Sequence, residues 1–387
     1  MKKELITLSI AVLLISCQCT CKPTNPTVIK NSVSSPAPTV LEMPTQEKVT
    51  KASPTLTEIK PLISSKPAEQ VSTPVQKPKQ TQTTSATMPK TPATVEKSEP
   101  ALNPVFGTDQ AKELIAQARA KQTLSKPQAD NPTFKNEPIL PLEGRLLSPM
   151  SYEPIIADNT HAPWSNESLQ YGLYYSFVKA GTAYIKTRGL TSINGKMAYL
   201  IQTTAFSASV IDSVFKVRDV NYSWLDVNTL HSLGYSQSVR EGNYVRDEWV
   251  AFDPDNHRYY GEVKKKKEPR TLVGQLDIEV LDMLSSMYYV RKEPLAVGKD
   301  VIFDIVNREK QYPLVVKVLG KETVKTDAGK FNCWVVEPQF RGEGIFVAKG
   351  KSLKVWLTDD AYRMPVKMEV EVFIGSVSAE LLAYQRN

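Results

Sequence analysis

Tryptophan and tyrosine are confined to the C-terminal part of this 387-residue chain. All 5 Trp and all 16 Tyr lie at or after Tyr152, and 16 of the 17 Gly lie after Gly107. A segment poor in large apolar side chains cannot bury enough surface to offset the conformational entropy that folding removes. We therefore expect one folded domain over residues 151–387, which is long enough to build a core without disulfides or metals.

The first sixteen residues have the pattern of a signal peptide. Lys2 and Lys3 make a basic start, and an apolar run over 5–15 follows. This run is too short to cross the ~30 Å hydrocarbon layer of a bilayer as a helix. We expect residues 1–16 to direct export and to be removed.

The leader ends in a short motif around Cys17. Leu14 stands three residues before Cys17, and the small Ser16 stands immediately before it. This motif resembles the lipobox of bacterial lipoproteins, in which the cysteine is lipidated and becomes the mature N-terminus. Cys19 and Cys21 fit the pattern less well, because neither has a leucine three residues earlier. The resemblance implies lipidation at Cys17 and a lipid-anchored protein of the cell envelope, which we expect on the outer membrane facing the periplasm.

Residues 17–150 are expected to form a disordered tether. Fourteen Pro and no Gly occur between Lys22 and Pro104, a composition that favours a stiff, extended polyproline II chain. A spacer role is the simplest interpretation, and binding of an acidic cell-wall polymer is the alternative. A short helix is predicted over 108–122, because Thr108 can cap it and Ala111, Leu114 and Ile115 share one face. The sequence leaves open whether this helix docks on the domain.

Strand patterns dominate residues 151–387. Residues 366–372 alternate between apolar and charged side chains, as expected for a strand with one face in water. Short turns such as Arg240-Glu241-Gly242-Asn243 indicate antiparallel neighbours. The fold class that follows is mainly β: a curved antiparallel sheet or half-barrel of about 10–12 strands, covered by one or two helices. The predicted strands are 169–177, 181–186, 196–206, 231–239, 244–252, 257–263, 300–306, 312–324, 329–337, 351–358, 364–373 and 376–385.

One helix is predicted over 276–291. Its apolar residues recur at helical spacing from Leu276 through Val280, Met283 and Met287, and Pro294 prevents continuation. Asp277 and Glu279 would complement the N-terminus of this helix. A second short helix is expected at 207–214.

A set of motifs is spread over residues 165–385: Gly181, Asp253-Pro254, Asp282, Tyr288-Tyr289, Arg291, Pro294, Gly298, Trp356, Asp359-Asp360, Arg363, Pro365 and Gly375. With these motifs the chain resembles a family of bacterial envelope domains of unknown function. The resemblance implies no activity. The expected shape is also similar to the half-barrel carriers of lipids and lipoproteins, but a shared fold does not imply a shared function.

Motifs for catalysis or metal binding are missing from the sequence. The three His are at least 26 residues apart, and no HExxH, CxxC or Gly-x-Ser-x-Gly pattern occurs. Asp253 and Asp255 are interpreted as turn residues, as are Asp359 and Asp360. Cys333, the only cysteine of the domain, is expected to be a buried apolar residue. We expect no catalytic residues, no metal, no cofactor and no enzyme activity.

The net charge of +7 gives little support for nucleic-acid binding. Residues 22–150 hold 16 Lys/Arg against 11 Asp/Glu, whereas residues 151–387 hold 30 against 29, so the excess lies mostly in the tether. No nucleic-acid partner is expected. Four consecutive lysines, Lys264, Lys265, Lys266 and Lys267, favour a solvated loop or contact with anionic headgroups, worth ~1 kcal/mol per lysine near an anionic surface.

Three functions remain after these exclusions. The leading hypothesis is a non-enzymatic lipoprotein whose domain binds a lipid or another apolar ligand between the predicted helix and the concave face of the sheet. Met283, Met287 and Tyr288 are the candidate lining residues, since flexible thioethers adapt to acyl chains; their alternative role is ordinary core. The second hypothesis is a scaffold that docks on an envelope protein or the cell wall. The third is an unrecognised enzyme acting on cell-wall glycan.

Overall fold

The structure is a computed structural model. It describes residues 106–121, 132–154, 160–265, 267–276, 279–307, 310–340, 352–371 and 375–386. The signal peptide, Cys17 and the tether up to residue 105 lie outside these ranges, so the predictions made for them are not tested.

The described residues form one antiparallel sheet of 14 strands. Its strand order is β8-β7-β6-β5-β4-β3-β2-β1-β14-β13-β12-β11-β10-β9, so the chain builds the sheet in two halves that meet where β1 pairs with β14. The strands are β1 (Ser168–Tyr175), β2 (Val178–Ile193), β3 (Lys196–Ser207), β4 (Arg218–Asp226), β5 (Ser232–Glu241), β6 (Tyr244–Asp253), β7 (Arg258–Lys264), β8 (Arg270–Gln275), β9 (Val301–Asn307), β10 (Lys310–Thr326), β11 (Gly329–Phe340), β12 (Leu353–Thr358), β13 (Pro365–Glu371) and β14 (Ser376–Gln385).

The predicted fold class is confirmed, with two more strands than expected. Strands β4 and β8 were not predicted. In β4, Val220, Tyr222 and Trp224 alternate with polar residues, so the signal is present in the sequence. In β8 it is weak, because the strand is short and contains Gly274.

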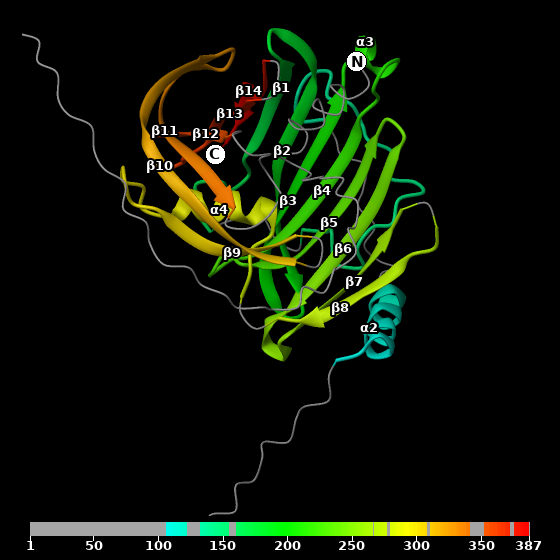
Figure 1. Cartoon of the computed structure of the whole chain (residues 1–387). Coiled ribbons are helices and arrows are strands. Elements are labelled where there is room, and N and C mark those ends of the chain that lie inside the picture. The colour runs from blue at the N-terminus through cyan, green and yellow to red at the C-terminus, as the bar shows by residue number, and fades with distance from the viewer. Residues whose placement is uncertain are drawn as a thin grey trace, which may run out of the picture. The chain divides into compact units, whose positions relative to one another are not determined.

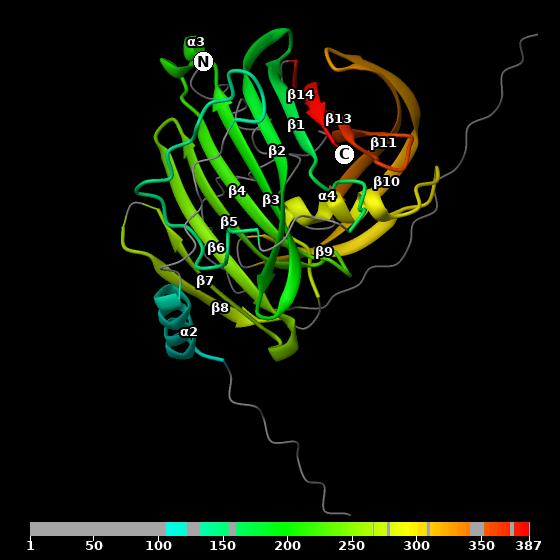
Figure 2. The ribbon, with the colours of Figure 1, turned by 180° about the vertical axis from the view of Figure 1, so that it is seen from behind.

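The sheet curls so that its two halves face each other across the helix α4 (Met283–Lys292) (Figures 1 and 2). One core cluster joins Ile185 and Ile201 of the first half to Val335 and Leu381 of the second, and it includes Tyr288 of α4. The helix therefore fills the concave side of the sheet, and much of its surface is buried there.

The convex face of the first half is covered by a segment that precedes the sheet. Phe134, Leu140 and Tyr152 are buried against β2–β6, and Glu137 forms an ion pair of 2.5 Å with Lys186. Residues 132–154 thus contribute buried side chains to the core, although the sequence predicts a disordered tether up to residue 150. Few apolar side chains are needed in this segment, because the sheet supplies most of the apolar surface on which they pack.

The predicted helix over 108–122 is confirmed as α2 (Thr108–Lys121). Ala111 and Ile115 are buried, as their shared face predicts, and the helix packs on β7 and β8. Arg119 forms an ion pair with Glu262 and lies 5.7 Å from the ring centroid of Trp249. The helix therefore docks on the domain.

The prediction that a helix begins at 276 is wrong for the described residues 279–282. Leu281 forms a parallel β-bridge with Ile305, and α4 begins only after Asp282. The carboxylate of Asp282 accepts hydrogen bonds from the Leu284 and Ser285 amides at 2.7 and 3.0 Å. This capping box fixes the start of the helix. Leu276 and Val280 lie before the helix. Their side chains are buried in a cluster with residues of the two edge strands, Leu272 of β8 and Val306 of β9.

The second predicted helix, over 207–214, is shorter than expected. The helix α3 spans only Ser209–Asp212 and buries none of its residues, so it does not cover the core. A turn of 3-10 helix at Pro254–Asn256 joins β6 to β7.

Candidate functional site

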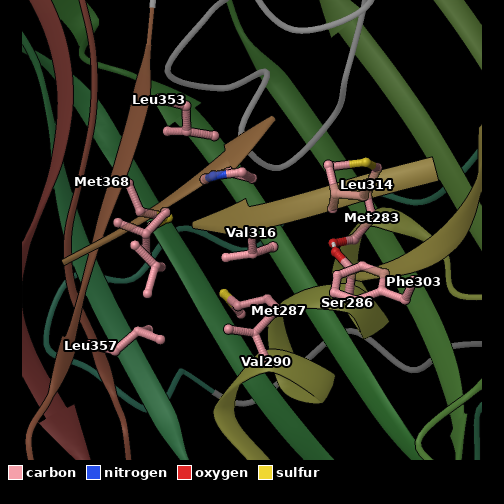
Figure 3. Close-up of a pocket in the computed structure, with 13 residues that line it drawn as sticks. Met283, Ser286, Met287, Val290, Phe303, Leu314, Val316, Leu353, Leu357 and Met368 are labelled. Atoms are coloured by element: carbon pink, nitrogen blue, oxygen red, sulfur yellow. Dashed lines mark hydrogen bonds between the residues drawn. The ribbon is translucent and has the colours of Figure 1, made fainter. Parts of the chain in front are cut away.

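A narrow apolar hollow lies between α4 and the second half of the sheet (Figure 3). Its cavity volume is about 80 Å³, and the empty space rises to about 640 Å³ only when the part open to solvent is included. Its lining comes from one helix and five strands: Met283, Ser286, Met287 and Val290 of α4, Phe303 of β9, Leu314 and Val316 of β10, Val336 and Pro338 of β11, Leu353, Val355 and Leu357 of β12, and Met368 of β13.

Strand alternation explains why these residues face inward. In β10, Leu314 and Val316 line the hollow, whereas Lys317 is exposed. Successive side chains of a strand point to opposite faces, so each strand contributes an apolar inner row and a more polar outer row. In α4 the lining residues Met283, Met287 and Val290 recur at helical spacing and therefore share one side of the helix.

No lining residue that the structure describes is charged. The single polar one is Ser286, whose hydroxyl donates to the carbonyl oxygen of Met283 at 2.8 Å. The described lining thus offers neither a proton donor of suitable pKa nor a carboxylate, and its surface suits an apolar ligand.

Two of the three predicted lining residues reach the hollow. Met283 and Met287 line it and are half-buried, and Met368 of β13 adds a third methionine that the sequence did not single out. Methionine side chains have several rotatable bonds and a polarisable sulfur, so they adapt to ligands of different shape.

Tyr288 does not line the hollow, and here the prediction is wrong. Its side chain is fully buried on the adjoining side of α4, where its ring lies 5.7 Å from that of Trp164 in an edge-to-face arrangement. Burial raises the pKa of Tyr288. One residue along a helix is a rotation of ~100°, which turns Tyr288 away from the side that carries Met287.

The wall formed by α4 is held in place by an ion pair that the sequence did not reveal. Arg291 donates two hydrogen bonds to the carboxylate of Glu167 at 2.8 and 2.7 Å, and both side chains are buried, with exposures of 0% and 1%. Arg291 also donates to the carbonyl oxygen of Tyr362. Burial lowers the pKa of Arg291, but Glu167 and the neighbouring tyrosines together outweigh this effect and raise it.

The four lysines lie away from the hollow. Lys264 ends β7, and Lys265 and Lys267 are exposed in the β7–β8 connection, while Lys266 lies outside the described residues. Strand β7 is next to one edge of the sheet, whereas the hollow is lined by β9–β13 at the other end of the strand order. The lysine run therefore belongs to a different surface.

Other candidate groups have structural roles. Asp253 accepts hydrogen bonds from Asn256 and Arg258, and Asp360 accepts from the amides of Tyr362 and Arg363, so both fix turns. Burial raises the pKa of Cys333 to about 12, which makes its thiol unreactive.

The described residues contain no group of three or more His, Cys, Asp or Glu arranged to hold a metal ion. Every helix in the described ranges falls short of the length and apolarity needed to cross a membrane.

Comparison with solved structures gives matches of low sequence identity. A beta-barrel-like protein of the DUF1849 domain from Brucella abortus is 10% identical, with a TM-score of 0.42, and the match covers 57% of this chain and 97% of that one. A protein with a YmcC-like fold from Bacteroides fragilis is 12% identical, with a TM-score of 0.26 and coverage of 57% and 96%. A proposed lipoprotein from Parabacteroides distasonis is 7% identical, with a TM-score of 0.21 and coverage of 57% and 95%.

Comparison with curated proteins finds no match. A family model described as "Protein of unknown function (DUF3108)" matches residues 170–382, which include 12 of the 14 strands in full, α4 and the whole lining of the hollow. The chain belongs to the DUF3108 family.

Proposed function

We propose that this protein is a non-enzymatic lipoprotein of the cell envelope whose domain holds an apolar ligand in the hollow between α4 and strands β9–β13. The observation that carries the proposal is the lining, in which 12 of 13 residues are apolar although the hollow opens to solvent. Protein interiors are normally close-packed, and the apolar side chains around the hollow, most of them buried, lack packing partners on the side that faces it. A ligand would supply those contacts.

The shape of the hollow favours an acyl chain. Its cavity volume of about 80 Å³ is well below the ~300–1,000 Å³ that is typical of ligand pockets, so the hollow is narrow and has no room for a bulky ligand. A thin, flexible chain fits such a narrow hollow better than a broad ring system. The three methionines among its lining can adjust to chains of different length and unsaturation.

Ligand binding can be tested with the purified full-length chain. Native mass spectrometry with lipid extraction should detect a bound fatty acid, phospholipid or polyprenyl compound, and a fluorescent fatty acid should compete for the same site. Met287→Trp places an indole in the hollow and should weaken binding of the fluorescent probe at least tenfold. Val355→Phe fills the same hollow with a smaller side chain than tryptophan and should also weaken binding. It provides the test if Met287→Trp does not fold.

Val297→Trp is the matched control, because Val297 is 64% exposed and does not line the hollow. Its affinity for the probe should equal that of the parent chain. Failure of the parent chain to bind any of these lipids, or equal affinities for all four proteins, would refute the proposal.

The proposed anchor is a lipidated Cys17, supported by its resemblance to a lipobox. Acyl chains contribute ~0.8 kcal/mol per buried methylene, so more than one chain holds a protein durably on a membrane. Cys17→Ala should abolish metabolic fatty-acid labelling and, where the leader is still processed, release the protein from membranes. Cys19→Ala and Cys21→Ala are matched controls and should keep both properties; labelling that persists in Cys17→Ala would contradict the assignment.

A further inference from the structure

Four connections between strands lie side by side along one end of the first half of the sheet. They are the β1–β2 turn at 176–177, the β3–β4 connection at 208–217 that contains α3, the β5–β6 turn at 242–243 and the β7–β8 connection at 265–269, and together we call them the loop rim. In an antiparallel sheet every second connection lies at the same end, which places all four here. Figures 1 and 2 show the β1–β2 hairpin and α3 at the same end of the sheet.

Backbone hydrogen bonds and strand register hold neighbouring connections together. The Ala208 amide of the β3–β4 connection donates to the carbonyl oxygen of Ala180, next to the β1–β2 turn, at 2.8 Å. The Gly242 amide of the β5–β6 turn donates to the carbonyl oxygen of Lys216 in the β3–β4 connection at 2.8 Å. The β7–β8 connection follows because Lys264 pairs with Asp247 near the start of β6. The loop rim is therefore built on the sheet itself.

Large apolar side chains are exposed at and next to the loop rim. Phe177 is 91% exposed and Val210 is 76% exposed, and they are joined by Val178 and Val214. These four are half of the eight large apolar side chains that are exposed among the described residues. Scattered single exposures are normal, but a group at one end of a domain indicates a contact surface.

The charge of the loop rim is positive. Lys179, Lys216, Lys265 and Lys267 are all exposed. Among the described residues of the four connections, Glu268 is the only exposed acidic residue, because Asp212 is half-buried and paired with Arg218 at 2.6 Å. Exposed apolar tips surrounded by lysines match a bilayer interface, where apolar groups enter the acyl boundary and lysines contact anionic headgroups.

We propose that the loop rim docks on the surface of an anionic bilayer. Phe177, Val178, Val210 and Val214 would enter the interface, and Lys216 and Lys267 would contact phosphates of the headgroups. This surface is separate from the hollow, so the proposal does not rest on ligand binding there. It also does not rest on Cys17, although a lipid anchor would keep the domain close to such a surface.

Depth-dependent fluorescence quenching tests the proposal on the full-length chain. Phe177→Trp places an indole at the tip of the β1–β2 turn and keeps it apolar. In vesicles of phosphatidylcholine and phosphatidylglycerol with brominated acyl chains, this indole should be quenched and its emission should shift to the blue. Ile302→Trp is the control, because Ile302 is 60% exposed on β9 and lies outside the loop rim. Its emission should not change.

Charge reversal tests the role of the lysines. Lys216→Glu and Lys267→Glu, added together to Phe177→Trp, should lower the vesicle partition coefficient at least tenfold, since each lysine near an anionic surface contributes about fivefold. Quenching should also fall in phosphatidylcholine vesicles without anionic lipid and at high salt. Lys317→Glu with Lys325→Glu, at exposed positions of β10, is the matched control and should leave quenching unchanged.

An indole at position 177 that is quenched no more than the one at position 302 would overturn the proposal. Equal quenching in the neutral and anionic vesicles, or in the charge-reversed and parental chains, would overturn the role of the lysines. Circular dichroism of each variant shows that the fold is kept. If the chain binds neither neutral nor anionic vesicles, a protein partner would be the better explanation of the exposed apolar side chains.

Discussion

Replacing Arg291 by methionine is expected to lower the free energy of unfolding by about 3–5 kcal/mol, a large part of the ~5–15 kcal/mol that stabilises a typical domain. The variant leaves the Glu167 carboxylate buried at 1% exposure without its two hydrogen bonds from the guanidinium. It also removes the donor to the Tyr362 carbonyl and the cation that lies 5.6 Å from the Trp164 ring centroid. Urea unfolding followed by tryptophan fluorescence measures the loss.

The double variant Glu167→Leu with Arg291→Met separates the ion pair from simple loss of packing. Removing both charges together leaves no unpaired buried group, so the double variant should be more stable than Arg291→Met alone. Lys325→Met, at an exposed position of β10, is the surface control and should change stability by less than about 0.5 kcal/mol. A loss in Arg291→Met no larger than in this control would show that the pair does not hold α4 in place.

Truncating Tyr288 and its neighbour Met287 is expected to have very different effects. Tyr288→Ala should cost about 3–5 kcal/mol, because the side chain is fully buried against Trp164 and Arg291. Met287→Ala should cost less than about 2 kcal/mol, because Met287 is half-buried and already borders empty space. Thermal and urea unfolding of both variants measure the difference.

This pair of variants separates a ligand site from ordinary core. If Met287 were core, its truncation would cost as much as that of a buried leucine or methionine, about 2–5 kcal/mol. If it lines an open hollow, Met287→Ala should stay folded and change lipid binding instead. Equal losses of stability in the two variants would favour the core interpretation.

The fold was predictable wherever a strand has one wet face. In β13, Val366, Met368 and Val370 alternate with Lys367 and Glu369, and the structure buries the apolar set. Strand β8 was not predicted, because this edge strand has only 6 residues and too few positions to show a clear alternation of apolar and polar side chains. The packing of residues 132–154 on the sheet was not predicted because their partners, such as Lys186 for Glu137, are distant in sequence. The alternation of apolar and polar residues identifies which face of a strand is buried. It does not identify the segment of the chain that packs on that face.

The candidate site was only partly predictable. The methionines of α4 pointed to the hollow because helical spacing places Met283 and Met287 on one side. Tyr288 was assigned to the hollow because α4 carries apolar residues on more than one side, and helical spacing alone does not show which buried side faces a cavity. The pairing of Glu167 with Arg291 joins residues that are 124 positions apart, and no local pattern encodes such a contact.

The most direct test of the proposed function is a crystal structure of the full-length chain grown with a fatty acid brominated at the end of its chain. We expect an anomalous bromine peak inside the hollow, between Met287 of α4 and Val316 of β10, with continuous density for the acyl chain. The same peak should be missing in crystals of Met287→Trp. A hollow that stays empty in the parent chain, with bromine found only at the loop rim or elsewhere on the surface, would contradict the account.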